Sequence, residues 1–319
     1  MTRIYAYPPG AVKAIPPAPA RSLGRVDAAG WALLGAPWDC SGEGRGEADA
    51  PAALRQAGLR GVVSHDAGDA ATAITTTARD PATGVRALDD TRRAASALTA
   101  ALVDLLARAP GRRPLVVGGD CSLLLGVLPA LRSRGPVGLW FVDGHPDYQS
   151  AAESATGETA DLDLALVTGD GPEPLVSLAG PPPMVPPAAA VLIGHRTTGL
   201  DVESAAEVAR VPEGLRRVDA ATLIADPRAA GARARGWLDR TGHGAWLHID
   251  LDVLDPASLP AVTYPQPGGP DWAALAAALR PLTASPHLLG VSVADFRPDL
   301  DEDGAYAARI VALLDEVLP

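Results

Sequence analysis

The stretch VGLWFVDGHPD at residues 137–147 carries the pattern that decides the fold. A short apolar run is followed at once by three side chains that bind protons or cations, Asp143, His145 and Asp147. Short runs of this kind are typical of a strand that is buried on both faces of a parallel sheet. Alternate residues of an extended chain share one face, so the three side chains are expected to point the same way.

Five further apolar segments resemble the opening one, and helical patterns separate several of them. The predicted strands lie at 31–37, 113–120, 137–145, 190–196, 245–255 and 287–296. Apolar residues at helical spacing predict helices over 89–109, 122–135 and 305–318. This alternation indicates an α/β fold, a parallel sheet with helices on both sides. Such sheets bind ligands beyond the carboxyl ends of their strands, where the polar residues of this chain fall.

The bulk composition excludes several classes of protein. The 319 residues are 47% hydrophobic, which provides ample material for a core. The net charge is −11 and the arginines are scattered, so no nucleic-acid partner is expected. No apolar run approaches the roughly 20 residues of a membrane span, and the first residues lack the apolar core of a signal peptide. Two cysteines, Cys40 and Cys121, do not make a disulfide scaffold, and we expect a cytoplasmic protein with no membrane partner.

The chain divides into an arm and one large domain. Residues 1–25 are rich in proline and alanine and show no periodicity, so they are predicted to form an irregular N-terminal arm. Residues 26–319 contain no convincing linker. Their length is normal for a single large α/β domain.

Polar clusters follow three of the predicted strands. They are GGDCS at 118–122, the opening stretch, and HIDLDVLDP at 248–256, which contains Asp250 and Asp252. Four carboxylates and an imidazole cannot lie together bare, because like charges a few Å apart repel one another or take up protons. Divalent cations would hold them, and such a site suits Mn²⁺ and also Fe²⁺, Ni²⁺ or Zn²⁺. Two cations would generate hydroxide at neutral pH, so the pattern indicates a hydrolytic site.

Each of these motifs is weak evidence when it stands alone. A single D-x-H-x-D or D-x-D is more often a surface feature, and a Gly-Gly pair is often only a turn. Their occurrence at equivalent ends of one predicted sheet favours a metal site. The remaining histidines lack ligand spacing and are expected to be structural or exposed: His65, His195, His243, His248 and His287.

In these motifs the chain resembles the ureohydrolase superfamily of arginases, agmatinases and formimidoylglutamases. GAPWDCSGEGRGEADAPAALRQAGL at 35–59 resembles the N-terminal signature of that family. GGDCS resembles G-G-D-H-S, DGHPD resembles D-A-H-x-D, HIDLDVLDPA resembles S-x-D-x-D-x-x-D-P, and ADFRPDLD at 294–301 resembles E-x-N-P-x-x-D. The resemblance covers most of the chain. It implies a three-layer α/β/α arginase-like fold around a mainly parallel eight-stranded sheet, two Mn²⁺ ions, and a homo-oligomer that is a trimer or a hexamer.

The resemblance also implies roles for individual residues. The positions that match family metal ligands are Cys121, Asp143, His145, Asp147, Asp250 and Asp252. Asp143 and Asp250 match the ligands that bridge both metals, and Asp147 matches the carboxylate that accepts a proton from the bridging hydroxide. In the family reaction this hydroxide attacks the guanidinium carbon, and a tetrahedral intermediate releases urea and an amine. Asp147 and Asp295 are therefore the predicted catalytic residues.

Three single positions depart from the family pattern. Cys121 replaces the first histidine ligand, and its softer thiolate favours Zn²⁺ or Fe²⁺ over Mn²⁺, with Ni²⁺ also possible. Members that act on N-hydroxylated arginine can carry such a cysteine. Asp295 is one methylene shorter than the glutamate that pairs with the guanidinium. Thr197 stands where arginases have an aspartate for the α-amino group, which argues against L-arginine itself.

The fourth departure lies in the substrate loop. Residues 153–165 lack the catalytic histidine of arginases and offer Glu158, Asp161 and Asp163 instead. These acids either open a helix, where negative charge is favoured, or meet a cationic substrate or a metal. On the second interpretation they are the predicted substrate-binding residues.

Two functions stay open at this point. The first is a metal-dependent hydrolase that acts on the linear C–N bond of a guanidino, hydroxyguanidino or formimino compound, with a small cationic substrate. The alternative is a non-catalytic member with a degenerate metal site, which the missing loop histidine, Cys121 and the shortened Asp295 support. A single-zinc deacetylase of the related fold ranks last, because the chain contains no His-His pair.

Overall fold

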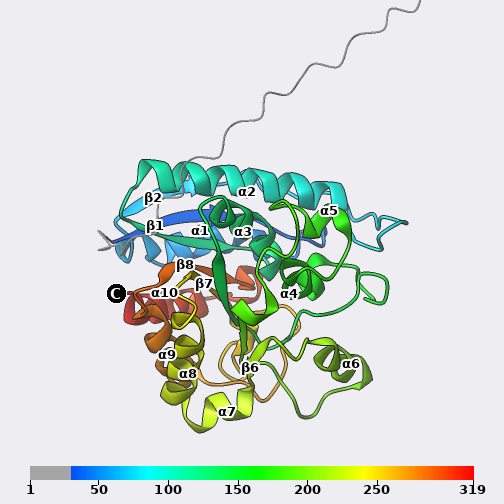
Figure 1. Ribbon diagram of the computed structural model, residues 1–319. Coiled ribbons are helices and arrows are strands. Elements are labelled where there is room, and N and C mark those ends of the chain that lie inside the picture. Colours follow the sequence, from blue (N-terminus) through cyan, green and yellow to red (C-terminus); the bar gives the residue numbers. More distant parts are fainter. Residues whose placement is uncertain (1–29) are drawn as a thin grey trace, which may run out of the picture.

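The computed structural model describes residues 30–319, and its centre is one sheet of eight strands (Figure 1). The strands are β1 (Trp31–Ala36), β2 (His65–Asp69), β3 (Arg113–Gly118), β4 (Val137–Val142), β5 (Ala190–Ile193), β6 (Arg216–Val218), β7 (Gly244–Asp250) and β8 (Leu288–Ala294). Their order is β2-β1-β3-β8-β7-β4-β5-β6, and every neighbouring pair is parallel. The predicted α/β fold with an eight-stranded parallel sheet is confirmed. The arm predicted at 1–25 lies outside the described residues.

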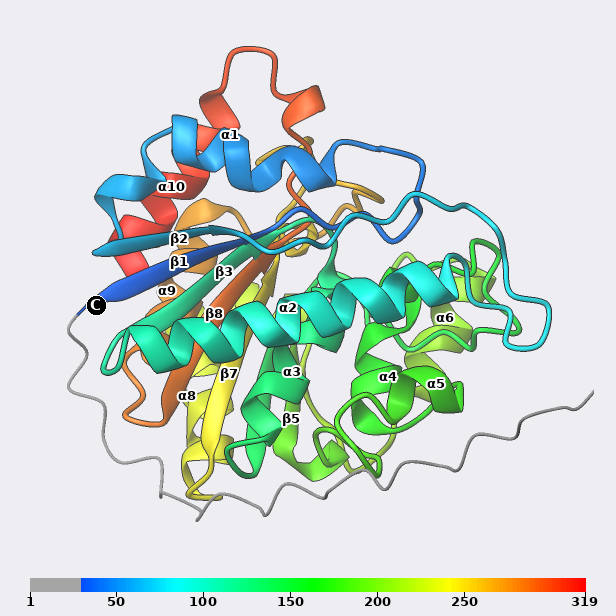
Figure 2. The same cartoon turned by 90° about the horizontal axis from the view of Figure 1, so that it is seen from above.

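Helices cover both faces of the sheet, so the fold has three layers. They are α1 (Ala50–Gln56), α2 (Leu88–Arg108), α3 (Leu124–Arg132), α4 (Asp163–Thr168), α5 (Glu173–Val176), α6 (Val202–Arg210), α7 (Ala220–Ala225), α8 (Pro227–Asp239), α9 (Trp272–Thr283) and α10 (Ala305–Val317). Helices α2 to α5 pack into one core, whereas α1 and α7 to α10 pack into the other. Figure 2 shows α1 and α10 on one side of the sheet and α2 on the opposite side. Among the described residues, none of the helices has the length and apolarity that a membrane crossing requires.

The apolar runs of the sequence arise because the central strands supply both cores. In β1, Ala32 and Leu34 face the α2 side, and Trp31 and Leu33 face the α10 side. Side chains of a strand alternate between faces, so a strand covered by helices on both faces is apolar at consecutive positions.

All six predicted strands are present, but two edge strands were not predicted. The segment HDAGD of β2 is largely exposed, and β6 is only three residues long. Strands at the sheet edges bury little surface, so neither segment carries an apolar run. The predicted strands also end earlier than expected: β4 stops at Val142 and β7 at Asp250.

Candidate metal and substrate site

The four central strands end at a common edge, and each delivers a polar residue there. In spatial order these strands are β3, β8, β7 and β4. Cys121 follows β3, Asp295 follows β8, Asp250 ends β7 and Asp143 follows β4. A cavity of about 270 Å³ is lined in part by Cys121, Asp250 and Asp295. The site is therefore at the carboxyl edge of the sheet, as expected for a parallel α/β fold.

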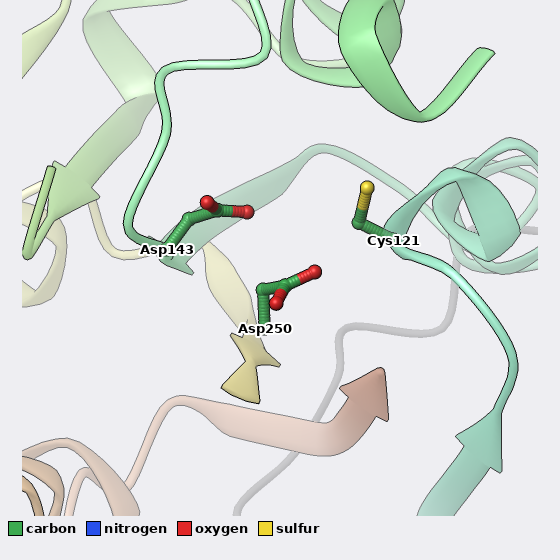
Figure 3. Close-up of side chains that lie close together, drawn as sticks. All are labelled: Cys121, Asp143 and Asp250. Carbon is green, nitrogen blue, oxygen red and sulfur yellow. The ribbon is translucent and has the colours of Figure 1, made fainter. Parts of the chain in front are cut away.

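Two overlapping groups of side chains at this edge have the composition of metal ligands. One ligand atom each from Cys121, Asp143 and Asp250 lies within 4.8 Å of the other two, and so do atoms from Asp143, His145 and Asp252. Figure 3 shows the thiol of Cys121 and the carboxyl groups of Asp143 and Asp250 around a common space. Asp143 belongs to both groups, which is the arrangement expected when a carboxylate bridges two cations.

The reason why these residues converge differs from the prediction. Asp143, His145 and Asp147 do not share the face of a strand, because β4 ends at Val142. The chain turns instead, and Asp147 adopts a left-handed backbone conformation with φ of 47°. Such strain in a residue other than glycine is concentrated at functional sites in proteins. Asp252 likewise lies beyond the end of its strand, in a short 3-10 turn.

His145 and Asp252 form a close pair. The imidazole Nδ1 is 2.6 Å from Oδ2 of Asp252, and the backbone N–H of Gly144 donates to Oδ1 over 2.9 Å. Burial disfavours a charged imidazole, but the charge of Asp252 outweighs it and raises the pKa of His145. Burial similarly opposes ionisation of Asp252, yet His145 lowers the pKa of this carboxyl group. Each group therefore favours the charged form of the other when no cation intervenes.

The other carboxyl groups of the site have no cationic partner as close as this one, and Asp143 lies 4.0 Å from the same imidazole. Burial, reinforced by neighbouring carboxylates, raises the pKa of Asp143, Asp147 and Asp250. Oδ2 of Asp143 and both carboxyl oxygens of Asp163 are buried without a hydrogen-bond partner among the described residues. A buried carboxylate without donors is costly, and a divalent cation supplies the missing positive charge. The residues present therefore fit the divalent cations that the resemblance implies.

Cys121 is held at the start of a helical turn. The carboxyl group of Asp120 accepts hydrogen bonds from the N–H of Cys40 at 2.6 Å and of Ser122 at 3.0 Å. The thiol of Cys121 donates to the carbonyl of Ala160, with Sγ 3.4 Å from the oxygen. Burial, then the nearby carboxylates, raises the pKa of the thiol well above its usual range. Cys121 is therefore protonated unless a cation displaces the proton.

The three acids of the substrate loop lie in different surroundings. Glu158 accepts a hydrogen bond from Nη1 of Arg45 at 2.9 Å and forms a second, closer contact with this guanidinium. Asp161 accepts hydrogen bonds from the hydroxyl groups of Ser154, at 2.8 Å, and Thr156. Asp163 begins α4, as the helix interpretation predicted, and is absent from the cavity wall. Their roles in substrate binding stay predictions.

Asp295 lies at the cavity, next to Asp250 and Asp252. The backbone N–H of Thr263 donates to both of its carboxyl oxygens, at 3.2 and 3.1 Å. The backbone of Asp295 is left-handed, with φ of 63°, which turns the chain directly after β8. A carboxylate that is held in this way is available to a cation in the cavity.

Thr197 and the histidines other than His145 lie outside the metal cluster. Thr197 is exposed and is absent from the cavity wall. His248 is buried, and its Nδ1 lies 2.8 Å from the hydroxyl of Ser292. It is a structural residue of β7, as predicted. The other four histidines that were expected to be structural or exposed also lie outside the ligand groups.

The structure adds cavity residues that sequence reasoning missed. They include Arg45 and Tyr264, and Gln149, Asp201, Glu203 and Glu207 near or on α6. Among the residues that the structure describes, the cavity wall carries twelve carboxyl groups, against one arginine and one histidine, which indicates a site for cations. The start of α6 could have been found from the pattern D-x-x-S, because Asp201 accepts a hydrogen bond from the N–H of Ser204. Nothing in the sequence places α6 beside the cavity.

Known proteins share both the sequence pattern and the fold. The model of the Arginase family matches residues 29–318. The arginase of Brevibacillus brevis is 27% identical over 292 residues, which cover 89% of this chain and 96% of that protein. An N(omega)-hydroxy-L-arginine amidinohydrolase of Streptomyces lavendulae is 29% identical over 209 residues, or 64% of this chain and 68% of that protein. The structure of the arginase from Bacillus caldovelox aligns with a TM-score of 0.78 at 27% identity, covering 90% of this chain and 97% of that one.

Proposed function

This chain belongs to the arginase family of hydrolases, and we propose that it cleaves a C–N bond in a small cationic guanidino, hydroxyguanidino or formimino compound. The observation that carries the proposal is the pair of overlapping ligand groups that share Asp143 at the carboxyl edge of the sheet. Buried carboxyl oxygens without hydrogen-bond partners support a requirement for cations at this place.

The proposed ligands of two divalent cations, Mn²⁺ by resemblance, are Cys121, Asp143, His145, Asp147, Asp250 and Asp252. When bound, such cations supply a hydroxide nucleophile at neutral pH. Asp147 lines the cavity, where its carboxylate can take up a proton during the reaction. Asp295, oriented by the N–H of Thr263, can pair with the cationic group of the substrate.

The charge of the cavity supports a cationic substrate and argues against L-arginine itself. The only arginine on the described cavity wall is Arg45, and it is paired with Glu158. A free α-carboxylate would therefore enter a strongly acidic cavity without a cationic side chain to receive it. Thr197, which replaces the aspartate of arginases, lies outside the cavity wall. Because a relative is named for N(omega)-hydroxy-L-arginine, the hydroxyguanidino group is a specific candidate for the reacting group.

The family resemblance also supports a homo-oligomer, and we propose a trimer or a hexamer. The molar mass measured by light scattering during size-exclusion chromatography tests this. A monomeric mass at micromolar concentration would contradict it.

The proposed reaction is tested by turnover of defined compounds. The purified protein is loaded separately with Mn²⁺, Zn²⁺, Fe²⁺ and Ni²⁺ and incubated with guanidino, hydroxyguanidino and formimino compounds, each with and without a carboxylate. We expect release of the amine together with urea, hydroxyurea or formamide, and faster turnover of the compounds without a carboxylate. Faster turnover of L-arginine than of every other compound would contradict the argument against L-arginine as the substrate.

An Asp143→Asn variant that is loaded in the same way serves as the inactive control, since it loses the shared ligand. Wild-type protein that binds cations but turns over none of the compounds would favour the non-catalytic alternative. Wild-type protein that binds no cation would overturn the metal site itself.

A further inference from the structure

Asp163 is a buried acid that the family pattern does not explain. It begins α4 at the far end of the substrate loop, and its exposed fraction is 0%. Neither of its carboxyl oxygens meets the geometry of a hydrogen bond with a described residue, although the carboxyl group of Asp147 is close enough to share a proton with it. It is absent from the cavity wall, on which Asp161 lies, so it does not face a substrate in the cavity as Asp161 does. A buried carboxylate in this state needs a proton or a cation.

Two other candidate metal ligands lie close to Asp163. One ligand atom each from Cys121, Asp147 and Asp163 lies within 4.8 Å of the other two. The three residues come from the turn after β3, the left-handed turn after β4 and the start of α4. Three separate segments of the chain thus bring these ligand atoms together.

Backbone contacts hold this third group in place. The N–H of Ala165 donates to the carbonyl of Asp147 over 3.1 Å, which ties the turn after β4 to the first turn of α4. The thiol of Cys121 donates to the carbonyl of Ala160, in the same loop as Asp163. These contacts hold the backbone around Asp163 close to Cys121 and Asp147.

We propose that Asp163 is an additional metal ligand, which binds one cation of the pair together with Cys121 and Asp147. This inference rests on the proposed function, because it concerns the same metal centre. Cys121 also belongs to the group of Asp143 and Asp250, so one cation can be held by both groups. The resemblance provides an imidazole where this chain has a thiol, and the extra carboxylate supplies a hard oxygen donor beside the soft sulfur.

A different arrangement would leave the same residues side by side. Asp147 and Asp163 could share a single proton, since two carboxyl groups at close range do not both ionise. In that case Asp163 would contribute nothing to the affinity for a cation. The two arrangements differ in metal binding, which can be measured without an assay of activity.

The experiment compares Asp163→Asn with the wild type and with Asp170→Asn. Asp170 is an exposed acid just beyond the other end of α4, so its variant is a matched control. Metal per chain is counted by elemental analysis after Mn²⁺ loading and desalting, and the Mn²⁺ affinity is measured by calorimetry. We expect Asp163→Asn to lose one equivalent, or to bind one Mn²⁺ more weakly by about 10–100-fold, while Asp170→Asn matches the wild type.

A second measurement reports on the bond between the metal and the thiolate of Cys121. In Co²⁺-loaded protein, charge-transfer absorption from the sulfur of Cys121 should weaken in Asp163→Asn. If Asp163→Asn does not fold, Asp163→Ala is measured in the same way.

The outcomes separate this inference from the proposed function. Unchanged stoichiometry and Mn²⁺ affinity in a folded Asp163 variant would overturn the role of Asp163 and leave the hydrolase proposal intact. A wild-type chain that takes up no cation would overturn both.

Discussion

At the scale of single residues, Cys121 is the position that distinguishes this site from a set of oxygen and imidazole ligands. Its thiol is buried between carboxyl groups and is one member of two candidate ligand groups. A thiolate is a softer donor than an imidazole, so this residue should decide which cation the site prefers.

Replacing Cys121 by histidine should therefore shift the preference toward Mn²⁺. We expect the ratio of Mn²⁺ to Zn²⁺ affinity to rise by at least about tenfold, as measured by competition calorimetry. Cys40→Ala is the control, because Cys40 is also buried near the cavity but belongs to none of the ligand groups. An unchanged ratio in Cys121→His would mean that Cys121 does not ligate the metal.

Asp250 is the residue whose loss should damage the centre most directly. It belongs to one ligand group with Cys121 and Asp143 and to another with Asp252 and Asp295. Asp250→Asn should weaken metal binding by more than about 100-fold and abolish turnover, since a ligand is lost from the middle of the site. Asp255→Asn, in the following loop and outside the ligand groups, should retain its metal by elemental analysis. Full activity of Asp250→Asn would remove the basis for the site.

At the scale of elements, the turn after β3 depends on a glycine. A Cβ atom on Gly119 would lie 1.4 Å from the carbonyl oxygen of Trp38, so the turns after β1 and β3 can pack only without a side chain. The N–H of Asp295 also donates to the carbonyl of Gly119 over 2.7 Å. This glycine therefore brings three strand ends together.

Gly119→Ala should lower the free energy of unfolding by about 1–3 kcal/mol or more, because the two turns must separate. Urea denaturation followed by circular dichroism measures the difference. Gly61→Ala is the matched control, since a Cβ atom there meets nothing within 4 Å and the residue has no left-handed φ. Equal destabilisation by the two substitutions would contradict the argument from close approach.

The first turn of α2 carries a buried acid with a structural role. Asp90 accepts hydrogen bonds from the N–H groups of Thr75, at 2.9 Å, and Thr76, at 3.1 Å, and pairs with Arg93. The hydrogen bond from Thr75 and the other contacts outweigh burial and lower the pKa of Asp90 below 3.8. The folded state therefore favours the ionised carboxylate.

This direction gives the contribution of Asp90 a definite dependence on pH. A carboxyl group whose pKa falls on folding stabilises the protein above its unfolded pKa, and the effect is lost as pH falls through the folded pKa. Asp90→Asn should thus cost about 1–3 kcal/mol at pH 7, and progressively less as the pH falls below 3.8. Asp89→Asn is the control, because that side chain is 80% exposed. Equal losses at neutral and at acidic pH would contradict the role of the charge.

At the scale of the whole molecule, the metal centre joins parts of the chain that are far apart in sequence. Cys121, Asp143, Asp250 and Asp295 follow or end the four central strands. Without cations, the buried carboxylates of these turns repel one another. Metal binding should therefore stabilise the entire sheet and not only the cavity.

Removal of metal by a chelator should lower the melting temperature, and added Mn²⁺ or Zn²⁺ should restore it. For one site, a cation at 100 times its Kd stabilises the fold by about 2.7 kcal/mol. Differential scanning calorimetry of stripped and reloaded protein measures the change, and Asp250→Asn should show almost none. A melting temperature that is indifferent to chelation and reloading would argue that no cation binds.

The predictable part of the fold lies in the sheet centre, and the unpredictable part lies at its edges. The run LWFV in β4 and the helical spacing of apolar residues in α2 reflect burial, which requires apolar residues at regular local positions. β2 and β6 lack that pattern, because they are stabilised by one neighbouring strand each and remain largely exposed. Strand ends were also predicted too late, since the polar residues beyond Val142 lie in turns.

The family, the parallel sheet and the strand ends that carry acids can be predicted from contiguous motifs and apolar runs. Which of these residues meet depends on the folded chain. The order β3-β8-β7-β4 is not the order of the chain, so the meeting of Cys121 with Asp250 depends on long-range packing. The same holds for the pairing of Arg45 with Glu158 and for the burial of Asp163 without a partner. The spacing of residues in the sequence specifies which side of a strand or helix a side chain occupies. Hydrogen bonding and burial depend instead on distant residues that the folded chain brings together.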